Sequence, residues 1–194
     1  MTSDNASIRE SGARTTPAFS VTSGRDKGYH RAAVDTFLAA ARAAFENSDG
    51  ELTAADVRVA SFPLVKEGYD VTEVDAALGR VEDALAARER DRAVRSRGAG
   101  VWVDQARGDA QVILDHLARP ARHRFARTNV LTFGYRVDEV DHVAGRIVRY
   151  LRDGEALTAE QLRSAAFRMQ RGGYREEQVD ALLDATVDVI LAVR

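Results

Sequence analysis

The sequence contains no cysteine and only three prolines among its 194 residues. The lack of cysteine excludes disulfides, thiol catalysis and thiolate metal sites. No apolar run approaches the ~20 residues of a membrane-spanning helix, and the N-terminus lacks the hydrophobic core of a signal peptide. The net charge of −2 creates no overall field that would attract DNA or an anionic surface. We therefore expect a cytoplasmic protein whose residues 1–17 form a disordered, polar tail.

One pattern occurs four times in this sequence: Gly-Tyr, four further residues, then Val-Asp. We expect each glycine to adopt a left-handed backbone in a turn that leads into a helix. Internal repetition of this kind is typical of a scaffold rather than of a single asymmetric pocket. The motif residues are Gly28, Tyr29, Val34 and Asp35; Gly68, Tyr69, Val74 and Asp75; Gly134, Tyr135, Val140 and Asp141; and Gly173, Tyr174, Val179 and Asp180.

The four copies form two tandem pairs. Residues 52–78 align with residues 157–183 at an offset of 105, with 12 of 27 positions identical. The first members of the pairs, which begin at Phe19 and Phe125, align at an offset of 106. A two-repeat module has therefore been duplicated, and we place the modules at residues 18–97 and 121–194.

Apolar residues follow each motif at alternating spacings of three and four, which is typical of helices that pack in a bundle. Thr53 with Asp56, and Thr158 with Gln161, predict capped short helices before the second and fourth copies. Asp70 with Glu73 predicts another capping box. Between the modules, the segment 98–120 predicts a connecting helix that ends at Pro120. The predicted class is all-α: a helical bundle of four turn-helix repeats arranged as a duplicated two-repeat module. The predicted apolar positions are Val34, Leu38, Ala41 and Phe45; Val71, Val74, Leu78, Val81 and Leu85; Val137, Val140, Ala144, Ile147 and Leu151; and Val179, Leu183, Thr186 and Ile190.

The stretch "LTAADVRVASFPLVKEGYDVTEVDAAL" resembles the N-terminal domain of the DivIVA family of bacterial division and polar-growth proteins. The shared pattern is Leu-Thr, a short helix, Phe, five residues, Gly-Tyr-Asp, Glu-Val and a helix. With all copies counted, the chain resembles an actinobacterial DivIVA-repeat protein over residues 18–97 and 121–194. The matching residues are Leu52, Thr53, Asp56, Phe62, Gly68, Tyr69, Asp70, Glu73, Val74 and Leu78, and in the fourth copy Leu157, Thr158, Phe167, Gly173, Tyr174, Val179 and Leu183.

This resemblance implies a cytoplasmic, non-enzymatic scaffold or adaptor of cell division or polar growth, located at the septum or pole on the inner membrane face. It would act by helix–helix association with itself or with a protein partner such as a DivIVA-type coiled coil. In the family, an apolar residue and an arginine precede Gly-Tyr at the loop tip and enter the bilayer interface. Here the positions are Asp26-Lys27, Lys66-Glu67, Thr132-Phe133 and Arg171-Gly172, so Leu131 and Phe133 come nearest to that pattern.

Neither the aspartates nor the histidines predict catalysis. Asp35, Asp75, Asp141 and Asp180 recur in every copy, which favours a structural role in the first turns of the helices. The four histidines show no metal-ligand spacing. We expect no catalytic residues, no metal, no cofactor and no small-molecule substrate. Asp180, Asp184 and Asp188 form a row on one helix, either as a solvated face or as the partner of arginines.

Five arginines and no acidic residue lie between His116 and Val137, interleaved with Phe125, Leu131 and Phe133. The favoured interpretation is that these arginines pair with acidic helix faces while Phe125 enters the core. Two alternatives stay open: a peripheral membrane protein that uses the loop around 119–136 for weak anionic contact, and a nucleic-acid-binding regulator, for which we expect less support. The candidate residues are Arg119, Arg122, Arg124, Arg127, Leu131 and Phe133, with Arg136 as the fifth arginine.

Overall fold

The computed structural model describes residues 18–46 and 52–193 of the chain, so the predicted tail at residues 1–17 lies outside the described residues. The described residues fall into two compact units, and each unit is treated by itself below. Unit 1 contains residues 18–46 and 60–78, and unit 2 contains residues 52–59 and 79–193. The units reflect which residues lie together in space, whereas the module limits at 18–97 and 121–194 follow from the sequence repeats. Those module limits stay a prediction.

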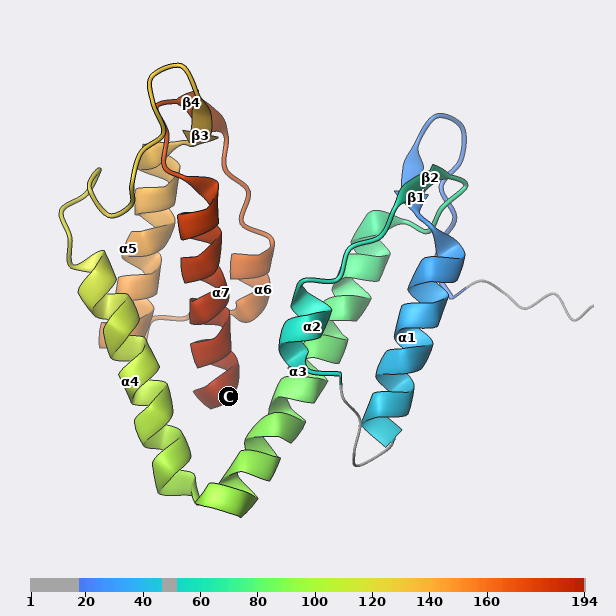
Figure 1. Ribbon diagram of the computed structural model, residues 1–194, viewed down its shortest axis with the longest axis horizontal. Coiled ribbons are helices and arrows are strands. Elements are labelled where there is room, and N and C mark those ends of the chain that lie inside the picture. The colour runs from blue at the N-terminus through green and yellow to red at the C-terminus, as the bar shows by residue number, and fades with distance from the viewer. Residues whose placement is uncertain (1–17, 47–51, 194) are drawn as a thin grey trace, which may run out of the picture. The chain divides into compact units, whose positions relative to one another are not determined.

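Unit 1 pairs the first two copies of the motif. Strand β1 (Lys27–Tyr29) lies antiparallel to β2 (Leu64–Lys66), with Gly28 opposite Val65. Helix α1 (Arg31–Glu46) follows β1, and the first residues of α3 (Val71–Arg97), up to Leu78, complete the unit (Figure 1). The Phe62 ring lies edge-on to the rings of Tyr29 and Phe37, so aromatic packing closes the base of the hairpin.

Unit 2 is a helical assembly with one hairpin. Helix α7 packs against both α4 and α6, and α4 also packs against α5 (Figure 1). Antiparallel strands β3 and β4 pair Gly134 with Gln170. The core includes Ile147, Tyr174 and Val187, which are fully buried. Besides residues 79–97 of α3, the elements are α2 (Ala54–Arg58), α4 (Ala99–Leu117), β3 (Phe133–Tyr135), α5 (Val137–Asp153), α6 (Ala159–Arg163), β4 (Met169–Arg171) and α7 (Glu176–Val193).

Most predicted apolar positions are buried, as amphipathic helices require. Val140, Ala144 and Ile147 lie along the buried face of α5, and Thr186 and Ile190 do so on α7. Phe45 is the clear exception, because its side chain is exposed near the end of α1.

The predicted helix starts are confirmed at α2 and α6. Thr53 with Asp56, and Thr158 with Gln161, each form both hydrogen bonds of a capping box. The box predicted at α3 is only half formed, because Asp70 accepts the Glu73 amide but the Glu73 carboxylate turns away. That carboxylate instead accepts hydrogen bonds from the backbone and hydroxyl of Ser20, and so ties the segment before β1 to α3.

The all-α prediction needs one correction, because residues 18–46 and 52–193, although mostly helical, also contain two two-stranded hairpins. Each strand is only three residues long, which is too short to show a period-two alternation in the sequence. The hairpins also join residues nearly 40 positions apart, so no local turn signal announces them. In the part of the chain that the structure describes, no helix is both long and apolar enough to pass through a bilayer.

Candidate functional site

The glycines of paired motif copies lie against each other. A Cβ on Gly28 would lie 2.2 Å from Tyr69 O, and a Cβ on Gly68 would lie 2.3 Å from Gly28 O. Gly134 and Gly173 meet in the same way, with 2.3 Å to Tyr174 O and 2.5 Å to Gly134 O. None of these four glycines has a positive φ, so the predicted left-handed backbone is wrong. The close approach of two backbones, rather than a special dihedral angle, requires glycine here.

The tyrosine of each copy reaches the aspartate of the copy with which it is paired. In unit 1 the Tyr69 hydroxyl donates to Asp35 Oδ2 at 3.3 Å, and the Tyr29 hydroxyl donates to Asp75. In unit 2 the same exchange joins Tyr174 to Asp141 Oδ1 at 3.3 Å and Tyr135 to Asp180 Oδ2 at 3.5 Å. The four copies thus form two reciprocal pairs. We name these contacts the crossed Tyr–Asp pairs.

The crossed pairs lie over buried valines. Val34 and Val74 in unit 1, and Val140 and Val179 in unit 2, are buried one residue before the aspartates. Within a helix this neighbouring position points inward while the aspartate faces the partner tyrosine. Each element of the Gly-Tyr and Val-Asp pattern is therefore occupied in packing one copy against another.

Burial and the adjacent carboxylates raise the pKa of all four motif tyrosines. For Tyr69 the largest cause is burial, followed by the hydrogen bond and charge of Asp35. Burial is also the largest cause for Tyr29, Tyr135 and Tyr174, and the partner aspartate adds to it. The neutral hydroxyl is the form that can donate to a carboxylate, so these groups hold their protons more tightly in the folded chain.

The segment rich in arginine folds back onto the start of α5. The Arg122 amide donates to Asp141 Oδ2 at 2.7 Å, and its guanidinium lies 3.2 Å from Asp138. Arg124 donates from Nη1 to Asp141 O at 3.1 Å and lies 3.4 Å from Asp141 Oδ1. Asp141 thereby receives hydrogen bonds from a tyrosine, an arginine side chain and a backbone amide.

Two further arginines of this segment donate to backbone carbonyls while their residues stay exposed, and Phe125 enters the core. Arg119 donates to Arg124 O at 3.3 Å and Arg127 to Gly172 O at 2.7 Å. Phe125 is buried, with its ring centroid 5.2 Å from that of Tyr174. The favoured interpretation, in which the arginines pair with acidic helix faces and Phe125 enters the core, therefore agrees with Arg122, Arg124 and Phe125, whereas Arg119 and Arg127 donate to backbone carbonyls instead.

The loop before β3 presents an apolar tip. Val130 and Leu131 are each 79% exposed and Phe133 is 51% exposed. Asn129 Oδ1 accepts hydrogen bonds from the amides of Leu131 and Thr132, which fixes the turn. We name residues 130–133 the apolar tip.

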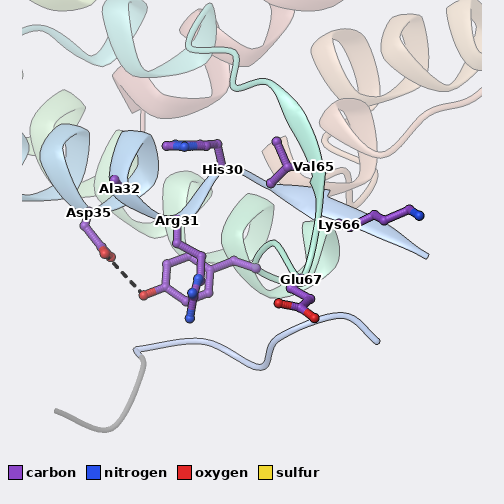
Figure 2. Close-up of a pocket in the computed structure, with 8 residues that line it drawn as sticks. His30, Arg31, Ala32, Asp35, Val65, Lys66 and Glu67 are labelled. Atoms are coloured by element: carbon purple, nitrogen blue, oxygen red, sulfur yellow. Dashed lines mark hydrogen bonds between the residues drawn. The ribbon is translucent and has the colours of Figure 1, made fainter. Parts of the chain in front are cut away.

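A shallow pocket of about 560 Å³ lies beside the Asp35–Tyr69 pair in unit 1. The Asp35 carboxylate accepts a hydrogen bond from the Tyr69 hydroxyl, and Figure 2 shows Asp35 on α1, with Lys66 at the end of β2 and Glu67 directly after it. The lining combines basic and acidic groups, so its charge selects no class of ligand. It is lined by His30, Arg31, Ala32, Asp35, Val65, Lys66, Glu67 and Tyr69.

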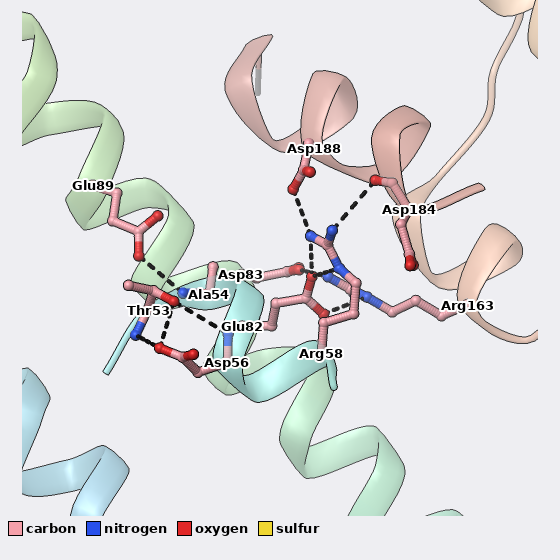
Figure 3. Close-up of polar contacts among 10 residues, drawn as sticks. All are labelled: Thr53, Ala54, Asp56, Arg58, Glu82, Asp83, Glu89, Arg163, Asp184 and Asp188. Carbon is pink, nitrogen blue, oxygen red and sulfur yellow. Dashed lines mark hydrogen bonds and ion pairs between the residues drawn. The ribbon is translucent and has the colours of Figure 1, made fainter. Parts of the chain in front are cut away.

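A buried ion cluster, which the sequence did not predict, lies in unit 2 (Figure 3). Glu82 is 2% exposed and lies 2.7 Å from Arg58 and 2.8 Å from Arg163. Arg58 also contacts Asp188 at 2.7 Å, and Arg163 contacts Asp83 at 2.9 Å. Arginine occupies both of the aligned positions 58 and 163, and this shared residue was the feature of the sequence that could have indicated the cluster.

The acidic row on α7 is only partly a solvated face. Asp188 pairs with Arg58, and the backbone carbonyl of Asp184 accepts a hydrogen bond from the same arginine. Burial raises the pKa of the Asp184 carboxyl. The positive charge of Arg58 lowers this pKa, and the negative charges of Asp180, Asp188 and Glu82 raise it further. Within the described ranges, no three acidic or histidine side chains are grouped closely enough to hold a metal ion.

No protein-family model, curated protein or solved structure matches this chain.

Proposed function

We propose that this protein is a non-enzymatic scaffold or adaptor of bacterial cell division or polar growth, related to the DivIVA family, that acts through helix–helix association. The crossed Tyr–Asp pairs carry this proposal. They use the tyrosines and aspartates of all four motif copies to join one helix start to another. Because the motif tyrosines and aspartates bind one another, they serve the packing of helices rather than chemistry on a substrate.

The proposal includes the duplicated two-repeat module. Both hairpins have the same register once the offsets of 106 and 105 are applied: Tyr29 opposes Leu64 as Tyr135 opposes Met169. The bridges of Tyr69 to Val21 and of Tyr174 to Arg127 follow the same offsets. Two like modules in one chain offer two like surfaces to a partner, which suits an adaptor at the septum or pole on the inner membrane face.

The test is direct binding to a purified DivIVA-type coiled-coil protein from the same bacterium, measured by biolayer interferometry. An unrelated parallel coiled coil of similar charge serves as the control. Selective binding to the first protein, together with septal or polar localisation of a fluorescent fusion, is the expected result. Equal binding to both coiled coils, or an evenly spread fusion, would contradict the proposal.

A second candidate is contact with an anionic membrane surface, and the exposure of the apolar tip favours it. Val130, Leu131 and Phe133 project from a turn fixed by Asn129, as side chains that enter a lipid interface would. Arg171 lies over the Phe133 ring, 5.6 Å from its centroid, and would place a positive charge at the headgroup level. Arg122 and Arg124 support this candidate less, because they contact Asp138 and Asp141.

Co-sedimentation with vesicles that contain anionic lipid tests the second candidate. Leu131→Asp should abolish binding at low salt, whereas Val112→Asp, at a 69% exposed site on α4, should leave it unchanged. If the wild-type chain stays in the supernatant, or if both variants bind as well as it does, the apolar tip has no membrane role. The contacts of the arginines with carboxylates and backbone carbonyls likewise give the nucleic-acid alternative no specific support.

A further inference from the structure

The ion cluster of unit 2 is arranged as an exchange between equivalent positions. Arg58 and Arg163 are related by the offset of 105, and so are Asp83 and Asp188. Arg58 on α2 binds Asp188 on α7, while Arg163 on α6 binds Asp83 on α3 (Figure 3). Each arginine therefore pairs with the aspartate that follows the other arginine in the chain. A surface that contacts its own equivalent in this crossed manner is self-complementary.

Glu82 occupies the middle of this exchange. One carboxylate oxygen contacts Arg58 and the other contacts Arg163. The position related to Glu82 by the same offset is Val187, so a single buried carboxylate joins both arginines. Charge therefore contributes much of the recognition between the α2–α3 face and the α6–α7 face.

Apolar packing between these two faces is incomplete. Ala86 of α3 contacts the core of unit 2 with only a small side chain. A cavity of about 200 Å³ lies beside the cluster, lined by Ala54 and Ala86 from one face and by Val189 and Ala192 from the other. Contacts of this kind depend on the charged residues and would be the same if the second face came from another copy of the chain.

A hinge that would permit such an exchange lies between α3 and α4. The two helices are separated by one residue, Gly98, whose φ of 92° and ψ of 149° interrupt the helical path. A Cβ on Gly98 or on Gly100 would meet no atom within 4 Å, so the space around both glycines is open. Glycine also adopts helical angles without a steric penalty. A rotation at Gly98 would join α3 and α4 into one helix from Val71 to Leu117.

We propose that the Arg58–Glu82–Asp188 face is an interface for a second copy of this chain, and that two copies exchange modules by straightening at Gly98. The α2–α3 face of each copy then pairs with the α6–α7 face of the other, and both interfaces repeat the contacts seen within one chain. Because the contacts are the same in both forms, concentration and the preference of the hinge decide between them. The proposal uses only contacts within unit 2 and does not depend on the scaffold function.

Light scattering after size-exclusion chromatography tests the hinge, with samples incubated at increasing concentration just below the melting temperature. Gly98→Ala disfavours the observed positive φ and should lower the concentration needed for dimerisation by about tenfold or more. Ala99→Pro should keep the chain monomeric, because proline suits the first position of α4 and prevents Gly98 from becoming helical. A wild-type chain that stays monomeric, or an Ala99→Pro chain that dimerises like wild type, would overturn the proposal.

A charge-reversal experiment identifies the interface itself. Neither Arg58→Asp nor Asp188→Arg can form this ion pair within one chain or in a dimer with itself, so each variant alone should dimerise about as much as wild type. An equimolar mixture of the two should be more dimeric than either variant, since only the mixed dimer forms both pairs: one interface joins the reversed charges and the other keeps the natural pair. A mixture that remains as monomeric as the single variants would refute exchange through this face, even if Ala99→Pro failed to fold.

Discussion

A Cβ on Gly134 would lie 2.3 Å from the backbone carbonyl oxygen of Tyr174, which belongs to the other motif copy of the pair. Tyr135 N donates to that same oxygen at 2.9 Å, and Tyr174 N donates to Tyr135 O at 2.9 Å. The backbones of two copies are thus joined by hydrogen bonds at a distance that excludes a side chain.

Gly134→Ala should therefore lower the free energy of unfolding by about 3 kcal/mol, near the upper end of the usual range for overpacking. The obstructing atom is backbone and cannot move aside without breaking the hairpin. Urea unfolding followed by circular dichroism measures the loss. Gly108→Ala in α4 is the matched control, because its Cβ would meet no atom within 4 Å; it should stabilise by about 0.5–1 kcal/mol. Equal effects of the two changes would contradict the packing argument.

Two of the four crossed Tyr–Asp pairs differ in the other groups that the aspartate contacts. Asp141 contacts Arg124 and the Arg122 amide as well as Tyr174. The side-chain contact described for Asp35 is the hydrogen bond from Tyr69. Asp141→Ala leaves a largely buried arginine without its carboxylate and should cost about 2–3 kcal/mol, against about 1 kcal/mol for Asp35→Ala. Thermal and urea unfolding of both variants measure the difference. A larger loss for Asp35→Ala would show that the arginine contacts do not stabilise unit 2.

Alkaline pH should weaken the pairing of the motif copies. Folding raises the pKa of Tyr29, Tyr69, Tyr135 and Tyr174 above the ordinary value of 10.0, so the folded chain holds these protons more tightly than the unfolded chain. The stabilisation is complete below pH 10 and is lost as the pH rises through the folded pKa values. Melting temperatures between pH 8 and 11, with phenolate absorbance recorded in parallel, test this. Tyrosine ionisation that begins below pH 10 in the folded chain would oppose it.

Acid should destabilise unit 2 through His116. Burial beside Phe125 is the largest cause that lowers the pKa of His116 below 6.5, and the positive charge of Arg119 adds to it. A depressed pKa in the folded state means that the stabilisation is present above pH 6.5 and is lost as the pH falls through the folded value. Melting temperatures between pH 5 and 8 should fall less steeply in His116→Phe than in wild type.

The exposed His142 provides the control for this experiment. His142→Gln should retain the wild-type dependence on pH, because it leaves His116 and Phe125 in contact. A His116→Phe chain that loses stability on acidification as steeply as wild type would place the pH dependence elsewhere.

Most of the helical structure of this protein could be predicted from its sequence. Apolar spacing placed the long helices, and Thr53 and Thr158 marked the short ones, because helix periodicity and capping depend on neighbours within four residues. The repeated motif likewise fixed which tyrosines, valines and aspartates hold equivalent positions. Hairpins of three-residue strands left no such local pattern.

The contacts that those positions make could be known only from the folded chain. It brought Gly28 against Gly68 and Gly134 against Gly173, and so showed that glycine is needed for close approach rather than for a left-handed turn. It also directed each tyrosine to the aspartate of another copy and gathered Arg58, Glu82 and Arg163 into one cluster. The partners in these contacts are 24 positions apart for Arg58 and Glu82 and 81 for Glu82 and Arg163, and only the packing of the folded chain brings side chains so distant in sequence within hydrogen-bonding reach.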